Sequence, residues 1–129
     1  MSAHRILVVD DEAYVTHVLR QYLERDGYSV RTASNGEKAL EAAEDFDPEV
    51  VITDVQMPRM NGQTLCEELV RRRAAAAPLL LVMTSRTDRE LRAWAQTMVA
   101  ADFLEKPVSP RRVLARIAEH FAPTEAGAA

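Results

Sequence analysis

The fold of this chain is decided by residues 50–58, which read Val-Val-Ile-Thr-Asp-Val-Gln-Met-Pro. A run of β-branched apolar residues leads directly into the carboxylate of Asp54. The run is too short for an independent helix and does not alternate between polar and apolar residues, so it predicts a strand buried on both faces of a sheet. Asp54 would then stand at the carboxyl end of a parallel strand, where open α/β sheets bind ligands.

Four other short apolar runs predict further strands, at residues 5–9, 28–33, 79–83 and 102–105. Between the runs, apolar residues recur at helical spacing, which predicts five helices. These helices are expected after residue 12, after residue 34, over about 62–75, around 90–98 and over 110–121. Strands that alternate with helices predict one α/β domain, in which helices cover both faces of a parallel sheet.

Local signals add detail to this plan. Ser34 and Glu37 have the spacing of a capping box at the start of the second helix. Gly27 can take the left-handed conformation that ends the first helix. Tyr22 falls on the apolar face of that helix and is expected to point inward, and Cys66 falls on the apolar stripe of the third helix, which favours core packing over chemistry.

The composition indicates a globular protein and limits its function. Hydrophobic residues make up 47% and charged residues 28% of the 129 residues, which fits one domain with a core. The formal charge of -4 argues against a general nucleic-acid surface. The single cysteine excludes an internal disulfide and a cysteine-rich metal site, so a cytoplasmic setting is expected.

The ends of the chain and its apolar runs give further expectations. No apolar run is long enough to span a membrane. The first strand begins at Arg5 and leaves no room for a signal peptide. We expect a domain over residues 1–122, followed by a disordered C-terminal tail over residues 123–129.

Charged and hydroxyl side chains follow four of the predicted strands. Asp10 and Asp11 follow the first, Asp54 ends the third, Thr84 follows the fourth, and Lys106, one of only two lysines, follows the fifth. Parallel strands bring their carboxyl ends to one rim, so these side chains should converge there. Crowded carboxylates without histidine or cysteine favour Mg²⁺ or Mn²⁺ over zinc.

A hard metal beside a lysine and a hydroxyl suits a phosphoryl group, and an aspartate can itself form an aspartyl phosphate. The alternative is a rim of solvated charges with Lys106 in an ordinary ion pair. Five side chains from four separate strands favour the phosphoryl site, because a chance convergence of this kind is rare.

Four motifs give the chain a strong resemblance to a known family. They are Val8-Val9-Asp10-Asp11-Glu12, residues 54–62 (Asp-Val-Gln-Met-Pro-Arg-Met-Asn-Gly), Val82-Met83-Thr84-Ser85 and Phe103-Leu104-Glu105-Lys106-Pro107. In this order they resemble the receiver domain of bacterial two-component response regulators, over about residues 5–121. The resemblance implies a flavodoxin-like (βα)5 doubly wound parallel sheet with strand order 2-1-3-4-5.

The resemblance also implies a role for each residue of the site. Asp54 would be the phosphoacceptor. Asp11 would bind Mg²⁺ directly together with Asp54 and the backbone carbonyl of Gln56, and Asp10 would act largely through water. Mn²⁺ is an alternative to Mg²⁺. Lys106 would contact the phosphoryl oxygens.

A switch is implied as well. Thr84 would move to hydrogen-bond the new phosphoryl group, and Phe103 would rotate into the space that Thr84 leaves. That movement would change the face formed by the fourth helix, the fifth strand and the fifth helix. A purely structural role for Phe103 in the core is equally open. The Lys106-Pro107 peptide bond would be cis.

As a member of this family, the chain would receive its phosphoryl group from a phosphohistidine on a sensor histidine kinase or a phosphotransfer protein. It would then control a partner, a second protomer or an attached output domain, without binding nucleic acid or a membrane directly. It would catalyse only its own phosphorylation and dephosphorylation, and so would not be an enzyme in the usual sense.

Three other functions are weighed against this one. A degenerate receiver acting as a scaffold is disfavoured by the complete set of Asp11, Asp54, Thr84 and Lys106. An aspartate-nucleophile phosphohydrolase would carry its nucleophile after the first strand and need a cap domain. A flavodoxin would need a phosphate loop rich in Ser, Thr and Gly after that strand, where this chain has acidic residues 10–12 that repel phosphate.

Overall fold

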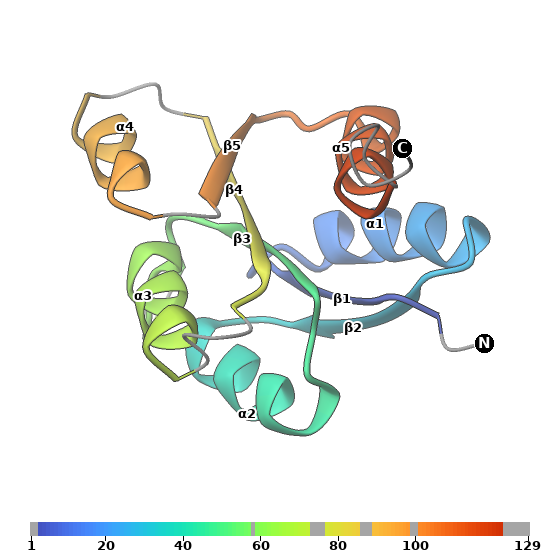
Figure 1. Ribbon diagram of the computed structural model, residues 1–129, viewed down its shortest axis with the longest axis horizontal. Coiled ribbons are helices and arrows are strands. Elements are labelled where there is room, and N and C mark those ends of the chain that lie inside the picture. The colour runs from blue at the N-terminus through green and yellow to red at the C-terminus, as the bar shows by residue number, and fades with distance from the viewer. Residues whose placement is uncertain (1–2, 58, 73–76, 86–88, 99–100, 123–129) are drawn as a thin grey trace, which may run out of the picture.

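Five strands alternate with five helices along the described part of the chain (Figure 1). The structure is a computed structural model and describes residues 3–57, 59–72, 77–85, 89–98 and 101–122. The strands are β1 (Arg5–Val9), β2 (Ser29–Ala33), β3 (Val50–Asp54), β4 (Leu79–Thr84) and β5 (Ala101–Glu105). The helices are α1 (Ala13–Arg25), α2 (Gly36–Phe46), α3 (Gly62–Arg72), α4 (Arg89–Gln96) and α5 (Pro110–Phe121).

The strands form one parallel sheet in the order β2-β1-β3-β4-β5, which confirms the predicted fold and strand order. β3 lies in the middle, and every residue from Val50 to Asp54 is buried. The register sets Val9 opposite Thr53 and Thr84 opposite Glu105. The carboxyl ends of β1, β3, β4 and β5 therefore reach the same rim of the sheet.

Helices cover both faces of the sheet: α2, α3 and α4 lie on one face, and α1 and α5 on the other (Figure 1). Side chains alternate along each strand, so each face has its own hydrophobic cluster. The first cluster joins Leu65 and Leu69 of α3 to Leu91 of α4, and the second joins Leu19 of α1 to Ile117 of α5. Each such side chain contributes about 1.5–3 kcal/mol when it is fully buried, so the helices hold the strand ends firmly in place.

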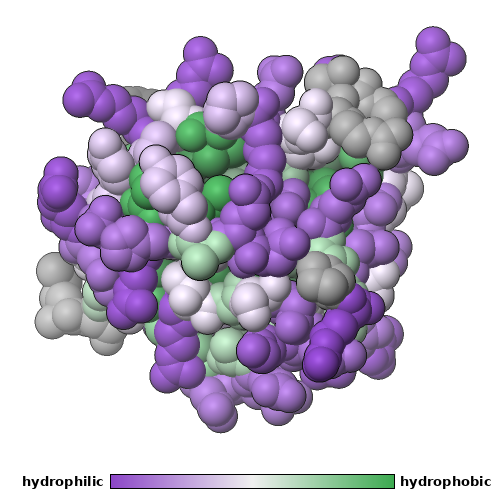
Figure 2. Space-filling model, turned by 180° about the vertical axis from the view of Figure 1, so that it is seen from behind, coloured by the Kyte–Doolittle hydropathy of each residue, from purple (hydrophilic) through white to green (hydrophobic). Residues whose placement is uncertain are grey.

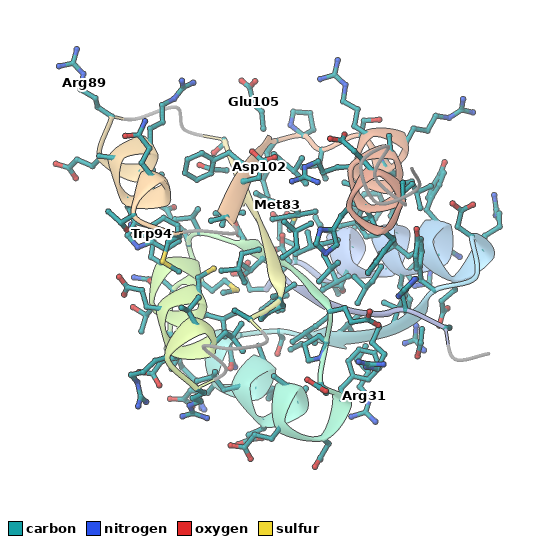
Figure 3. All side chains as sticks on the ribbon, in the orientation of Figure 1. Arg31, Met83, Arg89, Trp94, Asp102 and Glu105 are labelled. Atoms are coloured by element: carbon teal, nitrogen blue, oxygen red, sulfur yellow. The ribbon has the colours of Figure 1, made fainter. Side chains whose placement is uncertain are left out.

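Trp94 of α4 extends toward α3 (Figure 3), and its indole N–H donates a hydrogen bond of 3.1 Å to Glu67. Its ring packs against the first hydrophobic cluster while remaining partly exposed. Half-buried packing is therefore the role of Trp94 in this structure. The contact ties α4 to α3.

The face seen in Figure 2 is mostly hydrophilic, and hydrophobic residues show there only in small areas between polar side chains. Within the described residues, no helix is both long and apolar enough to cross a membrane. Tyr14 is the most exposed large hydrophobic residue, with 78% of its surface accessible.

Two local predictions are wrong. The N-cap of α2 is Asn35, whose side chain accepts a hydrogen bond from the Lys38 N–H at 2.9 Å, so Ser34 and Glu37 do not form a capping box. α2 begins at Gly36, so Asn35 and not Ser34 stands directly before the helix. Tyr22 is 36% exposed, because the face of α1 that meets the sheet is centred on Leu19 and Leu23.

Other local predictions hold. Gly27 ends α1 with a φ of 94°. The Lys106-Pro107 peptide bond is cis. The predicted end of the third helix at residues 73–75 and the predicted tail at residues 123–129 lie outside the described residues.

Cys66 of α3 gives a simple test of the packing. Its side chain is fully buried in the first hydrophobic cluster, and this burial raises the pKa of the thiol to about 12. The thiolate is the reactive form, so the folded protein is expected to react with a thiol reagent such as Ellman's reagent at least about 100-fold more slowly than the unfolded chain at pH 8. Equal rates with and without denaturant would contradict the buried placement.

Candidate functional site

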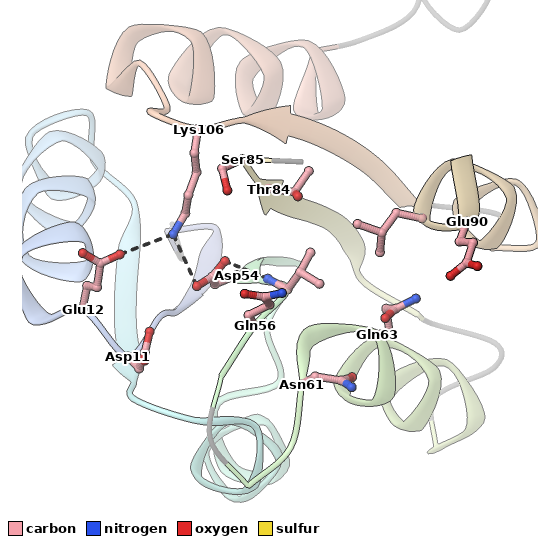
Figure 4. Close-up of a pocket in the computed structure, with 12 residues that line it drawn as sticks. Asp11, Glu12, Asp54, Gln56, Asn61, Gln63, Thr84, Ser85, Glu90 and Lys106 are labelled. Atoms are coloured by element: carbon pink, nitrogen blue, oxygen red, sulfur yellow. Dashed lines mark hydrogen bonds and ion pairs between the residues drawn. The ribbon is translucent and has the colours of Figure 1, made fainter. Parts of the chain in front are cut away.

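Polar residues at the carboxyl ends of the strands meet at the rim, as predicted (Figure 4). The pairing of Val9 with Thr53 brings the residue after β1, Asp10, beside Asp54 at the end of β3. Asp10, Asp11 and Asp54 each offer a carboxylate oxygen, and these oxygens all lie within 4.8 Å of one another. The fold thus collects three acids from two strands at one point.

Lys106 is the cation of this cluster. Its ammonium nitrogen lies 3.1 Å from Asp10 Oδ2, 3.3 Å from Asp54 Oδ2 and 3.6 Å from Glu12 Oε1. Its backbone N–H donates to the Thr84 carbonyl at 2.8 Å, which fixes the start of its side chain at the end of β4. Only 17% of the side chain is exposed, so the ammonium points into the cluster rather than into solvent.

Burial and neighbouring charges together set the pKa values of Asp10 and Lys106. Burial raises the pKa of the Asp10 carboxyl, and the charge of Asp54 raises it further, while the Glu12 N–H and Lys106 lower it. Burial alone would lower the pKa of Lys106, but its ion pairs with Asp10 and Asp54 outweigh that effect and raise it. Lys106 is therefore protonated at neutral pH, and the acids are crowded enough to gain from a further cation.

The three acids differ in how they are engaged. Both oxygens of Asp10 have partners, because Oδ1 accepts the Glu12 N–H at 2.9 Å and Oδ2 accepts from Lys106. Asp11 is exposed, and no described residue donates a hydrogen bond to its carboxylate. Oxygen donors of this kind suit Mg²⁺ or Mn²⁺, with Asp11 better placed for direct coordination than Asp10.

Asp54 is held by the backbone around it. Only 9% of its surface is exposed, and its Oδ1 accepts a hydrogen bond from the Val55 N–H at 2.8 Å. The loop after β3 folds back so that the Gly62 N–H donates to the Val55 carbonyl at 2.8 Å. The backbone of Gly62 lies so close to the Asp54 carbonyl oxygen that a Cβ atom would overlap it. The position of α3 therefore depends on a glycine at this point.

Thr84 and Phe103 lie on the same face of the sheet. Leu80 and Val82 of β4 belong to the cluster under α3 and α4, and Thr84 continues this alternation. Phe103 is paired with Val82 in the register and packs against the same cluster. Phe103 thus lies on the same face of the sheet as Thr84, beside Val82 and so further from the rim, and its ring is partly buried.

An open pocket of about 770 Å³ extends from the acids over the rim. Five of the predicted residues line it, namely Asp11, Asp54, Gln56, Thr84 and Lys106. Other residues for which the sequence predicted no role in the site also line the pocket: Glu12, Asn61, Gln63, Ser85, Glu90 and Leu91.

Two of these additional residues carried a signal in the sequence. Glu12 directly follows the pair of aspartates, and Asn61 directly precedes Gly62. The side chain of Asn61 accepts a hydrogen bond from the Thr64 N–H at 2.8 Å, so it caps the start of α3. Glu90 and Leu91 could not be found in this way, because they reach the pocket through the packing of α4.

Comparisons with known proteins agree with this geometry. Residues 6–118 match the family model of the response regulator receiver domain. One curated relative is the alkaline phosphatase synthesis transcriptional regulatory protein PhoP of Bacillus subtilis (strain 168), which is 39% identical over 113 residues. The match covers 88% of this chain and 46% of PhoP. The chain spans about half the length of the curated relatives it matches.

Solved structures show the same architecture. A CheY-like response regulator receiver domain protein from Methanospirillum hungatei JF-1 superposes with a TM-score of 0.84 at 29% identity, over 92% of this chain and 94% of that chain. The chemotaxis response regulator CheY4 of Vibrio cholerae gives a TM-score of 0.81 at 27% identity, over 92% of this chain and 98% of that chain.

Proposed function

The chain belongs to the response regulator receiver domain family, and on this premise we propose that Asp54 accepts a phosphoryl group in a Mg²⁺-dependent reaction. The observation that carries the proposal is the surroundings of Asp54. Its nearly buried carboxylate lies 3.3 Å from the Lys106 ammonium and shares a cluster of oxygens with Asp10 and Asp11. A solvated surface carboxylate would have neither partner.

The transfer follows from this arrangement. A bond forms between a carboxylate oxygen of Asp54 and phosphorus, the P–N bond of a phosphohistidine breaks, and its electron pair stays on the imidazole nitrogen. Such transfers need positioning and charge stabilisation more than proton transfer by the protein. Lys106 supplies fixed positive charge for the phosphoryl oxygens, and the Val55 N–H orients the carboxylate.

The donor set fits a hard divalent cation. We assign direct coordination to Asp11, Asp54 and the backbone carbonyl of Gln56, which all line the pocket, and an indirect contact through water to Asp10, whose side chain is fully buried and does not line the pocket. Bound there, Mg²⁺ or Mn²⁺ would supply positive charge that neutralises the negative charge of the phosphoryl oxygens.

Mg²⁺ is expected to stabilise the folded protein, because it relieves the repulsion among Asp10, Asp11 and Asp54 and binds only the folded state. At about ten times its dissociation constant, it should raise the free energy of unfolding by about 1.4 kcal/mol. Differential scanning fluorimetry would show a rise of about 5 °C in the melting temperature. Asp11→Asn should lose most of this rise, whereas Glu41→Gln on the exposed face of α2 should keep it. An equal rise in Asp11→Asn would contradict the assignment.

Output is proposed to pass through Thr84 and Phe103. The phosphoryl group adds roughly -1.5 to -2 units of charge and new acceptor oxygens, which draw the hydroxyl of Thr84 toward Asp54. Phe103 stands behind Thr84 on the same face, packed against the cluster that includes Leu91 of α4. A shift of Thr84 would change the packing of α4 and so the surface formed by α4, β5 and α5.

The proposed phosphodonor is a sensor histidine kinase or a phosphotransfer protein, in the cytoplasm. The proposed target of the switch is a partner protein, a second protomer or an attached output domain. Response regulators of the PhoP type are transcriptional regulators about twice the length of this chain, which supports an attached output domain as one form of the output.

The direct test is phosphorylation by acetyl phosphate with Mg²⁺, followed by intact-mass spectrometry. One added phosphoryl group per chain is expected, and it should be absent when EDTA replaces Mg²⁺. A folded protein that gains no phosphoryl group from acetyl phosphate and binds no beryllofluoride would contradict the proposed function.

A further inference from the structure

Glu12 is placed so that its side chain serves the site rather than its helix. It occupies the N-cap position of α1, where a side chain ordinarily accepts a backbone N–H, yet its carboxylate makes no capping hydrogen bond. Its backbone N–H donates to Asp10 Oδ1 at 2.9 Å, and its Oε1 lies 3.6 Å from the ammonium of Lys106. The carboxylate thus turns away from the helix and across the pocket (Figure 4).

The position of Glu12 differs from that of the other acids around Lys106. Asp10 and Asp54 contact the ammonium from inside the protein, with 0% and 13% of their side chains exposed. The side chain of Glu12 is 65% exposed. It therefore contacts Lys106 from the solvent side, at the mouth through which a phosphodonor must enter.

The charges at the mouth are unbalanced. Of the described residues that line the pocket, Asp11, Glu12, Asp54 and Glu90 are acidic and Lys106 is the one base. An incoming phosphoryl group must approach this acidic surface and must also compete with Glu12 for Lys106. Glu12 opposes an anionic donor in both ways.

We propose that Glu12 is a positioning and specificity-determining residue, which holds Lys106 in the resting protein and disfavours highly charged small phosphodonors. The inference rests on the proposed phosphorylation of Asp54. A phosphohistidine presented by a protein can bring basic groups that offset the charge of Glu12, whereas a free anion such as acetyl phosphate cannot. Glu12 would thereby protect the site from metabolic acyl phosphates.

The test compares two small donors of different charge on Glu12→Gln. At neutral pH acetyl phosphate is a dianion and phosphoramidate a monoanion. Removing one charge at the mouth is expected to speed phosphorylation by acetyl phosphate about three- to tenfold, and by phosphoramidate about two- to threefold. The rate would be followed by intact mass at saturating Mg²⁺ and subsaturating donor.

The dependence of the phosphorylation rate on ionic strength distinguishes an electrostatic role of Glu12 from a purely structural one. Salt screens the repulsion between Glu12 and the donor, so the wild-type rate with acetyl phosphate should rise between low and high ionic strength. The Glu12→Gln rate should rise less, because one of the repelling charges is gone.

Two control variants complete the design. Glu12→Asp keeps the charge at the mouth but shortens the side chain by one methylene group, so it should keep most of the wild-type dependence on ionic strength. Glu119→Gln removes an exposed carboxylate near the far end of α5 and should leave both rates unchanged. Thermal melting would confirm that each variant folds.

The outcomes separate the two proposals. If neither donor phosphorylates the folded wild type, the proposed function fails. If the wild type is phosphorylated but Glu12→Gln is no faster, or gains equally with both donors and keeps the wild-type salt dependence, the function stands and the inference about Glu12 is overturned.

Discussion

Asp54→Asn is expected to lose phosphorylation by acetyl phosphate, with a fall in rate on the order of a thousandfold or more. An amide is a far poorer nucleophile than a carboxylate, and the other acids of the cluster cannot replace it. The side chain of Asp10 is fully buried and does not line the pocket, and Asp11 is exposed. Intact-mass spectrometry should find the added phosphoryl group in the wild type alone.

The substitution is conservative enough to make the result clear. The amide oxygen of asparagine can accept the Val55 N–H as Asp54 Oδ1 does, so the end of β3 should keep its shape. One less charge reduces the repulsion with Asp10 but also removes the ion pair with Lys106, so the melting temperature should change little. The matched control is Asp45→Asn on the exposed face of α2, which should be phosphorylated like the wild type. A phosphoryl group on folded Asp54→Asn would assign the acceptor to another residue.

Gly62→Ala is expected to have the largest effect on stability. A Cβ at this position would overlap the Asp54 carbonyl oxygen and lie 3.0 Å from the Asp54 carbonyl carbon and 3.1 Å from Val55 Cα. All three are backbone atoms of the central strand or its continuation, so no flexible side chain can make room. We expect a loss of about 3 kcal/mol in the free energy of unfolding, the upper end of the usual range for overpacking.

Urea unfolding followed by circular dichroism would measure this loss. The matched control is Thr64→Ala, in the same turn of α3 but with an exposed side chain, which should cost less than about 1 kcal/mol. Since the overlap falls on Asp54 itself, the remaining folded Gly62→Ala protein should also be phosphorylated more slowly. A stability equal to that of Thr64→Ala would show that α3 can move away from β3 without cost.

The strands and most of the rim could be predicted because their signals are local. A buried parallel strand must be apolar throughout, so 50–54 and 79–83 stand out in the sequence. Each of these strands ends where its apolar run ends in the sequence. Once the strands are known to be parallel, this places Asp54, Thr84 and Lys106 on the same rim.

The errors arose where several residues compete for one local role. Ser34 and Asn35 can both cap a helix, and Asn35 takes the role because α2 begins at Gly36, one residue later than a cap at Ser34 would require. Tyr22 and Leu23 both lie near the apolar side of α1, and the angle at which the helix meets the sheet leaves Tyr22 at the surface.

By itself the sequence determined the number and order of the elements, the parallel sheet and the five polar side chains that gather at its rim, because apolar runs, helical spacing and strand ends are properties of neighbouring residues. Only the tertiary structure decided that Glu12 meets Lys106 from the solvent side and that Gly62 presses on the Asp54 carbonyl. The first contact joins two segments distant along the chain, and the second closes the loop between β3 and α3. In both cases the distance is decided by how a helix packs on the sheet, which a pattern of neighbouring residues does not specify.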